Sequence, residues 1–490
     1  MRLDDDLKYF EEPEFKDILA RYEAAREAGN SLYMDADDLT DVAEYYAMVC
    51  HDDERANEAI ELALQLHPDA VDPQVFVARQ LMQKGDNDGA RKACDAIEDQ
   101  QHREVSFLRG ELLVREQKAE DAFNYLYQLS LEVEEDRDYF LYDSANIFID
   151  YREFEPALKL AEELEKIAPN WFRTWELQAD IQLGLEHYDV ALPFIEKMLD
   201  KDPFYVDAWN WSTEAYCGLA QFEKAMECTD FALAVAPDNE RAKQLKAWIY
   251  LQQGNFNEAH RIYKELQTTN PDCELHFLYD SYCMLDADDT EAALRLIEQA
   301  EEISGGMSPE QVVIYEQHAH VLSVLHDLEQ ALDYIDLAEQ QNSEKTAIDY
   351  DLFRARIYAE NGQPGEAIGF IQKCMMKDEK SAVQTYFQGA QIMFDTDYSD
   401  AALHMFLDII EHTEDEALRK ECYAYVAVCY HDQHKPELVL EYIRKAIDSG
   451  ANNLKDVMGF LFNENVTPNE YFDYYYYEVY GQWPDAPLPF

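Results

Sequence analysis

Residues 206–237 read VDAWNWSTEAYCGLAQFEKAMECTDFALAVAP, and this stretch predicts two helices joined by a short turn. Trp209, Thr213 and Tyr216 are spaced three and four residues apart, as on one face of a first helix. Pro237 ends the second helix, because proline has no N–H to donate and disfavours helical geometry in the residue before it. The stretch therefore predicts one helix–turn–helix unit.

The same unit recurs along the chain at a step of 34 residues. Three residue types keep this step: Pro169, Pro203, Pro237 and Pro271; Ala157, Ala191, Ala225, Ala259 and Ala293; and Phe154, Tyr188, Phe222 and Phe256. We expect small side chains where the two helices of a unit approach most closely, namely the alanine series on the second helices and Ala145, Ala179, Thr213, Ala247 and Ser281 on the first. The aromatic series is expected to fill the gaps where one unit meets the next. A period near 34 predicts a long array of stacked helical hairpins.

The spacing of Trp209, Tyr216, Ala225, Ala232 and Pro237 resembles the tetratricopeptide repeat (TPR). The next unit has the same pattern, in Ala247, Tyr250, Gly254, Ala259, Tyr263 and Pro271. The resemblance implies an all-α fold, a right-handed α-α superhelix of about twelve helix–turn–helix repeats with helical caps. The remaining key positions are predicted at Ala56, Ala90, Ala122, Ala331, Ala367 and Ala401, with a twelfth unit near Leu438.

We expect three parts along the chain. They are an N-terminal helical cap at 1–36, a TPR array at 37–450 that is most regular over 138–305, and a C-terminal helical cap at 451–490 with a Tyr-rich helix and a Pro-containing tail. The first cap is predicted to hold a helix over 13–28 that ends at Gly29 and Asn30. Thr467–Pro468–Asn469–Glu470 is predicted to start the Tyr-rich helix, which ends at Gly481. Terminal units of a repeat array need such caps, because their outer faces have no neighbour.

Acidic residues dominate the composition. Asp and Glu total 102 against 40 Lys and Arg, which gives a formal net charge of −62. Such a surface repels nucleic acid phosphates and anionic lipid headgroups, so we expect neither as a partner. A basic partner, or simply the solubility of a long exposed array, accounts for the charge.

The sequence also favours a cytoplasmic protein. The N-terminal residues have no apolar core of a signal peptide, and no stretch is long and apolar enough to predict a membrane span. The nine cysteines are scattered and never form C-x-x-C, so they predict small buried side chains rather than disulfides.

The resemblance implies that the first helix of each unit lines a concave groove, with its second, fifth and ninth positions facing a ligand. These positions are Tyr142, Asn146, Arg173, Glu176, Asp180, Asp207, Asn210, Glu214, Arg241, Gln244, Trp248 and Tyr282. Tyr142, Trp248 and Tyr282 would be aromatic anchors, and the alternative is that some of these side chains pack between units. Some TPR proteins grip a terminal carboxylate with Lys, Arg and Asn, but the acids at these positions favour a basic or amphipathic segment instead.

No catalytic or cofactor motif is present. Phosphate-binding glycine loops, G-x-S-x-G, H-E-x-x-H and the dinucleotide fingerprint are all missing. Cys429-x-His431-x-x-His434 and His318-x-His320 are the ligand-like clusters, and neither has the remaining ligands of a zinc site. We therefore predict no metal, no cofactor and no enzymatic activity. A deep cleft that gathers carboxylates with strongly shifted pKa values would favour an enzyme instead.

The main hypothesis is a non-enzymatic scaffold or adaptor that binds a protein segment in the groove. The alternative is a regulatory module that acts on an enzyme or assembly through the Tyr-rich C-terminal helix. Candidate docking residues there are Tyr474, Tyr475, Tyr477 and Trp483. A plain end cap, whose aromatics cover the last repeat, is the competing interpretation of that helix.

Overall fold

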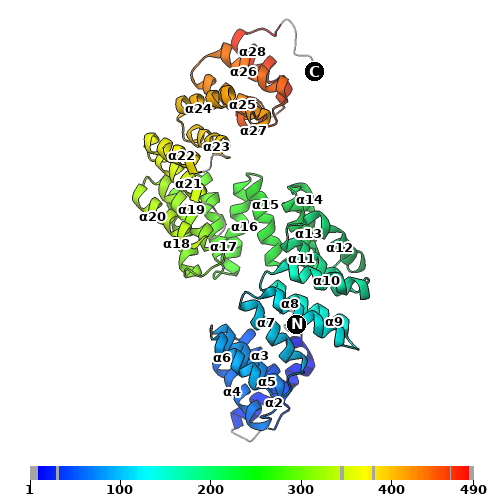
Figure 1. Ribbon diagram of the computed structural model, residues 1–490. Helices are drawn as coiled ribbons and strands as arrows, with labels where there is room; N and C mark the ends of the chain where they lie inside the picture. Colours follow the sequence, from blue (N-terminus) through cyan, green and yellow to red (C-terminus); the bar gives the residue numbers. More distant parts are fainter. Residues whose placement is uncertain (1–8, 29–32, 343–346, 378–380, 464, 485–490) are drawn as a thin grey trace. The chain divides into compact units, whose positions relative to one another are not determined.

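Every regular element that the structure describes is a helix (Figure 1). The computed structural model describes residues 9–28, 33–342, 347–377, 381–463 and 465–484. Gly29 and Asn30, predicted to end the first helix, lie outside the described residues, as do positions 485–490 of the Pro-containing tail.

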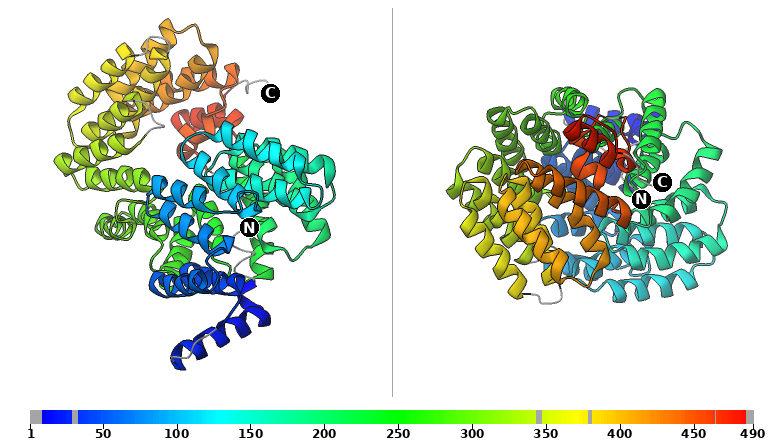
Figure 2. Two further views of the ribbon diagram at one scale, coloured as in Figure 1. Left: turned by 60° about the horizontal axis from the view of Figure 1, so that its bottom comes forward. Right: turned by 90° about the horizontal axis from the view of Figure 1, so that it is seen from above.

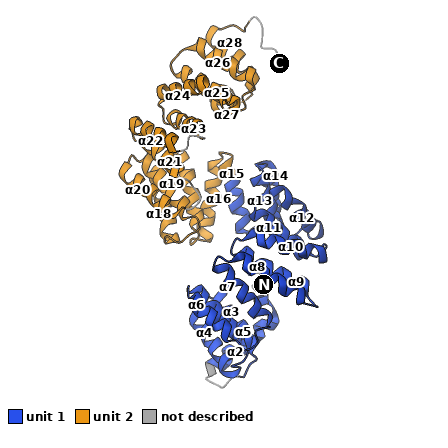
Figure 3. Ribbon diagram, viewed as in Figure 1, with its two compact units in different colours: residues 1–249 blue, residues 250–490 orange. Residues whose placement is uncertain are grey.

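The chain forms two compact units, Met1–Ile249 and Tyr250–Phe490 (Figure 3). The helices that begin in unit 1 are α2 (Pro13–Ala28), α3 (Ala36–Met48), α4 (Asp53–Leu66), α5 (Val71–Gln83), α6 (Asn87–Ala96), α7 (Arg103–Arg115), α8 (Ala119–Glu132), α9 (Arg137–Asp150), α10 (Phe154–Ile167), α11 (Phe172–Gly184), α12 (Tyr188–Lys201), α13 (Val206–Gly218), α14 (Phe222–Val235) and α15 (Glu240–Gln252).

Unit 2 continues the same succession of helices. They are α16 (Phe256–Thr269), α17 (Glu274–Asp286), α18 (Thr290–Ser304), α19 (Gln311–Val324), α20 (Leu328–Gln341), α21 (Ala347–Glu360), α22 (Pro364–Lys377), α23 (Ala382–Asp395), α24 (Ser399–His412), α25 (Glu416–Asp432), α26 (Pro436–Ser449), α27 (Leu454–Met458), the 3₁₀ turns η1 (Gly459–Leu461) and η2 (Pro468–Glu470), and α28 (Tyr471–Tyr480).

Consecutive helices pack as hairpins, in which the odd-numbered helix comes first and the even-numbered helix second. Unit 1 contains the pairs α3/α4 to α13/α14, and unit 2 contains α17/α18 to α25/α26, with α15 and α16 between them in chain order. Neighbouring pairs lie side by side within each unit (Figures 1 and 2). The predicted all-α array of about twelve repeats is confirmed.

The small residues that we predicted at the helix contacts within the pairs are almost all buried. The alanine series on the second helices is fully buried from Ala56 to Ala367, and so are the five small residues predicted on the first helices. The predicted register is wrong by one residue in the last two helix pairs, α23/α24 and α25/α26. Ala402 and Val439 are fully buried there, whereas Ala401 and Leu438 are only half-buried. The first helices of these two pairs are longer, with 14 residues in α23 and 17 in α25 against 13 in α11 and α13, and this shifts the second helices away from the step of 34.

The prolines and aromatics also lie where the period predicts. Pro169, Pro203, Pro237 and Pro271 each follow the last residues of a second helix. The Phe154 ring of α10 lies against Gly184 of α11 in the next repeat, and the Tyr188 ring of α12 lies against Gly218 of α13. Phe154 and Tyr188 therefore contact the following first helix, where a glycine leaves room for each ring.

We predict that Gly218→Ala lowers the free energy of unfolding by about 1–3 kcal/mol, because the added methyl overpacks this contact. A Cβ atom at Gly218 would lie 2.2 Å from Cε2 of Tyr188. Gly369 in α22 is the control, because a Cβ there meets nothing within 4 Å. Gly369→Ala should gain about 0.5–1 kcal/mol from helix propensity alone. Urea titrations followed by circular dichroism measure both changes, and a gain at Gly218 would refute the packing described.

Both predicted cap helices are present. α2 begins at Pro13 and is described to Ala28, and it buries Phe15 and Tyr22. At the other end, Thr467 and Glu470 form the predicted capping box before α28, which stops at Gly481 in the left-handed region.

Candidate functional site on the first helices

In unit 1 the predicted groove residues of neighbouring first helices are bonded to one another. The Tyr142 hydroxyl of α9 donates to Glu176 Oε2 of α11 over 3.3 Å, and the Tyr205 hydroxyl before α13 donates to Glu176 Oε1 over 2.7 Å. Arg241 Nη2 of α15 lies 2.7 Å from Glu214 Oε1 of α13. These contacts cross from one repeat to the next, so the polar side chains of this face help to fix the spacing of the first helices.

Tyr142 is packed between units rather than presented as an anchor. Its side chain is 1% exposed. The Trp171 ring lies edge-on at 5.7 Å, and the guanidinium carbon of Arg173 lies 5.2 Å from the centre of the Tyr142 ring. Tyr142 therefore packs between repeats, which is the alternative that we drew from the sequence, because residues of the following repeat cover it. The aromatic ring exposed beside it is Tyr139.

Two predicted groove amides are buried as well. Asn210 is 3% exposed, and its Nδ2 donates to Asn239 Oδ1 over 3.2 Å. Asn146 is 5% exposed, and its amide atoms have no hydrogen-bond partner among the described residues. Neither side chain is presented to a ligand in this structure, in contrast to the prediction.

The other predicted groove residues remain partly accessible. Arg241 is exposed, and the half-buried side chains are Arg173, Glu176, Asp180, Asp207, Glu214, Gln244, Trp248 and Tyr282. The Trp248 ring lies 6.3 Å from Phe222, and Gln244 Nε2 donates to Glu240 over 3.2 Å. Tyr282 belongs to unit 2, where its ring stacks on Tyr279 and burial raises its pKa.

Unit 2 contains a pocket of about 610 Å³ that is lined by three successive first helices. We call it the first-helix pocket. Its residues are Asp349, Leu352, Phe353 and Arg356 of α21, Gln388, Gln391, Ile392 and Asp395 of α23, and Tyr425 of α25. It combines an apolar and aromatic wall with polar groups, which is the usual make-up of a binding pocket.

The polar groups of the first-helix pocket are held by their neighbours. Arg356 Nη2 lies 2.9 Å from Asp395 Oδ2, which joins α21 to α23. Gln391 Nε2 donates to the Tyr425 hydroxyl over 2.9 Å, which joins α23 to α25. Burial raises the pKa of Tyr425, so the phenol stays protonated. The Tyr425 ring also stacks on Phe406 at 4.7 Å, which fixes its position in the wall.

Sequence reasoning missed this pocket, although a usable signal was present. Asp349, Leu352 and Arg356 precede Ala367 by the same distances at which Asp207, Asn210 and Glu214 precede Ala225. The groove positions in α21 could therefore have been predicted from the same spacing. Those in α23 could not, because the buried alanine of the following second helix is Ala402, one residue after the predicted Ala401.

The ligand-like clusters of the sequence do not converge. His318 Nδ1 lies 2.9 Å from Glu301, whereas His320 Nε2 lies 4.0 Å from Glu360. Residues two apart on a helix point to different sides, so the two imidazoles take different partners. His431 Nδ1 lies 2.9 Å from the Tyr475 hydroxyl, and the pKa of Cys429, a fully buried thiol, is raised to about 12 by burial.

The Tyr-rich helix α28 has two faces. Tyr471, Phe472 and Tyr475 are buried, and α28 packs on α26. Tyr475 is therefore a cap residue rather than a docking residue. On the exposed side Trp483 stacks on Tyr477 at 4.7 Å and meets Tyr474 edge-on at 5.3 Å. These three rings form an exposed cluster, which we call the tail cluster.

The cysteines behave largely as predicted. All nine lie within the described residues and none forms a disulfide; Cys94, Cys228, Cys283, Cys374, Cys422 and Cys429 are buried. Cys50 is the exposed exception. Within the described residues, no helix combines the length and apolarity needed to cross a membrane.

Stacked antiparallel helix pairs with a pocket on their first helices define an α-helical repeat protein. Residues 182–249 match the model of the tetratricopeptide repeat family. The resemblance to the tetratricopeptide repeat that we drew from the sequence is confirmed by this match. No curated protein matches the chain.

Several solved structures are similar to it. A tetratricopeptide repeat protein from Parabacteroides merdae shares 16% identity, with 54% of this chain and 98% of that chain covered and a TM-score of 0.42. The human IFIT1 dimer with PPP-AAAA shares 14% identity over 78% of this chain and 90% of that chain, with a TM-score of 0.42. The APC/C hetero-tetramer Cut9-Hcn1 shares 14% identity over 94% of this chain and 92% of that chain, with a TM-score of 0.36.

Proposed function

We propose that this protein is a non-enzymatic scaffold that binds a basic or amphipathic segment of a partner protein on its first helices. The observation that carries the proposal is the first-helix pocket, because three consecutive repeats contribute to one concave site. Tetratricopeptide repeats generally mediate protein–protein interaction, and the proposal adds where the segment binds and what character it has.

Charge and shape support the character of the segment. The pocket presents the carboxylate of Asp349, and that of Asp395 paired with Arg356, beside the apolar side chains of Phe353 and Ile392. The chain as a whole carries a formal charge of −62, which attracts basic polypeptides over about 8–10 Å at physiological salt. The helices are fixed by their packing before binding, so little ordering cost falls on the scaffold.

The test starts from peptides selected on the full chain from a random phage-displayed library. We expect the selected peptides to combine basic and apolar residues. Gln388 lines the pocket and is exposed, so Gln388→Arg adds a positive charge, the same sign as that of the expected peptide, without disturbing the core. It should weaken the affinity at least about tenfold, which corresponds to roughly 1.4 kcal/mol.

Gln372→Arg is the matched control, because Gln372 is exposed on the second helix α22 and lies outside the pocket. Its affinity should stay within about twofold of that of the unaltered protein. Equal weakening by both substitutions would contradict the proposal, since the added charge would then act through the overall field alone.

The tail cluster supports a second candidate, a regulatory module that acts through α28. Tyr474, Tyr477 and Trp483 are 40%, 46% and 53% exposed, and contiguous exposed rings of this kind are typical of interaction sites. If the selected peptides bind there, Tyr477→Ala with Trp483→Ala abolishes binding and Gln388→Arg does not. That result would favour the alternative.

A further inference from the structure

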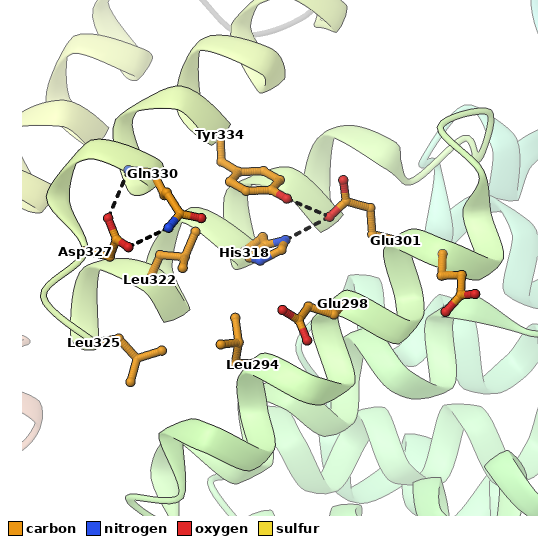
Figure 4. Close-up of a pocket in the computed structure, with 10 residues that line it drawn as sticks. Leu294, Glu298, Glu301, His318, Leu322, Leu325, Asp327, Gln330 and Tyr334 are labelled. Carbon is orange, nitrogen blue, oxygen red and sulfur yellow. Dashed lines mark hydrogen bonds and ion pairs between the residues drawn. The ribbon is translucent and has the colours of Figure 1, made fainter.

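A second pocket lies between second helices of unit 2 (Figure 4). We call it the second-helix pocket. Its volume is about 620 Å³. Two second helices, the first helix between them and the connection that precedes the later second helix line it. The residues are Leu294, Glu298, Glu301 and Glu302 of α18, His318 and Leu322 of α19, Leu325 and Asp327 of the connection between α19 and α20, and Gln330 and Tyr334 of α20. It shares no lining residue with the first-helix pocket.

The charge of the second-helix pocket is entirely acidic. Glu298, Glu301, Glu302 and Asp327 line it, and its ten lining residues, all within the described part of the chain, include no Lys or Arg. Asp327 already caps α20 through the backbone of Gln330. The three glutamates of α18 are therefore the carboxylates available to a ligand.

Glu301 is held in place through one carboxylate oxygen. Both the Tyr334 hydroxyl, at 3.0 Å, and His318 Nδ1, at 2.9 Å, bond to Oε2 of Glu301 (Figure 4). Neither of these two groups bonds to its Oε1. The His318 ring is 4% exposed and stacks on Tyr334 at 4.0 Å. Burial lowers the pKa of His318, so at neutral pH no imidazolium offsets the carboxylates.

Leucines supply the rest of the wall. Leu294 of α18 and Leu322 of α19 face the same opening, and Leu325 is at its rim (Figure 4). Arginine and lysine have this divided chemistry, since their aliphatic stems pack on apolar surface while the charged head seeks carboxylates. We propose that the second-helix pocket takes an arginine or lysine side chain of a partner polypeptide. The protein then has two distinct docking points in unit 2, on different helices.

The probe for the test is a fluorescein-labelled hexapeptide of alternating leucine and arginine, measured by anisotropy on the full chain at about 0.15 M salt. A second probe replaces each arginine with citrulline, which keeps the shape and removes the charge. We expect Glu298→Gln with Glu301→Gln to weaken the arginine probe roughly tenfold or more, because each charge-assisted bond is lost. The amide oxygen introduced by Glu301→Gln would still accept from Tyr334, so the wall should persist.

The matched control is Glu366→Gln with Glu411→Gln. Both glutamates are exposed on second helices, and neither lines a pocket described above. This control removes the same charge, so its loss of affinity should stay within about twofold. Leu325→Arg is a second variant that retains every carboxylate and places a guanidinium at the rim, and it should block the probe.

Several results would overturn the proposal. They are equal weakening by the two double variants, equal affinity of the citrulline probe, or undiminished binding to Leu325→Arg. Gln388→Arg should leave this probe unaffected, and if it alone weakens binding, the probe occupies the first-helix pocket instead. Failure here and failure of the scaffold proposal are therefore separable.

Discussion

Ala225→Leu is expected to lower the free energy of unfolding of unit 1 by about 1–3 kcal/mol or more, because the added carbons have no space to occupy. Ala225 is fully buried in α14, which packs against α13, where Thr213 is also fully buried. Helices that pack at about 8–10 Å depend on such short side chains. Urea titrations followed by circular dichroism give the change in midpoint.

Ala234→Leu is the matched control in the same helix. Ala234 is exposed, so the same substitution meets solvent and should change the stability by less than about 0.5 kcal/mol. Equal effects of the two substitutions would show that the alanine series does not mark the helix contacts.

Asp351→Ala is expected to lower the free energy of unfolding of unit 2 by roughly 1.5–3 kcal/mol, the range for a hydrogen bond to a charged group, because Lys373 and Lys377 are partly exposed and can be hydrated. Asp351 is 3% exposed in α21. Its carboxylate lies 2.6 Å from Lys377 Nζ and 3.4 Å from both Lys373 Nζ and Arg354 Nη1. Without it, Lys373 and Lys377 of α22 lose this carboxylate, whereas Arg354 of α21 keeps Asp336 and Glu339.

Asp336→Ala is the control, because Asp336 binds the same guanidinium from the surface. It lies 2.6 Å from Arg354 Nη2 with its side chain 57% exposed, so its removal should cost less than about 1 kcal/mol. A larger loss at Asp336 than at Asp351 would contradict the account of this cluster.

The contribution of Asp351 also has a defined pH dependence. Burial opposes its ionisation, but the hydrogen bonds and charges of Lys377 and Lys373 outweigh burial and lower its pKa. A carboxyl whose pKa is lower in the folded state stabilises above its unfolded pKa of about 3.9 and loses that contribution as the pH falls. The stability difference between the unaltered protein and Asp351→Asn should therefore be full at neutral pH and shrink below about pH 4.

The regular features of the fold could be predicted from sequence because each one has a single cause. Ala225, Pro237 and Phe222 keep one period, and a period near 34 admits one kind of unit. The predicted register fails at Ala401 because the first helix α23 is one residue longer than α13, and the period of the packed side chains does not predict helix length. At the C-terminus, Thr467 and Glu470 predict a helix start by a local hydrogen-bond pattern, and the structure confirms it.

The candidate sites were less predictable, for reasons of packing. A groove position on a first helix does not say whether the next repeat covers it, as Trp171 and Arg173 cover Tyr142. The second-helix pocket depends on how α18, α19 and α20 pack, which residue spacing does not predict. The spacing of His318 and His320 resembles a pair of metal ligands, but His318 is hydrogen-bonded to Glu301 in the structure.

The most direct test of the account is photo-crosslinking of a selected peptide to the full chain. A photoreactive benzoylphenylalanine replaces either Gln388 on the first helix α23 or Gln372 on the second helix α22, both exposed. We predict that the peptide is captured from position 388 and not from position 372. Capture from position 372 alone, or equal capture from both, would contradict the claim that the first helices form the binding face.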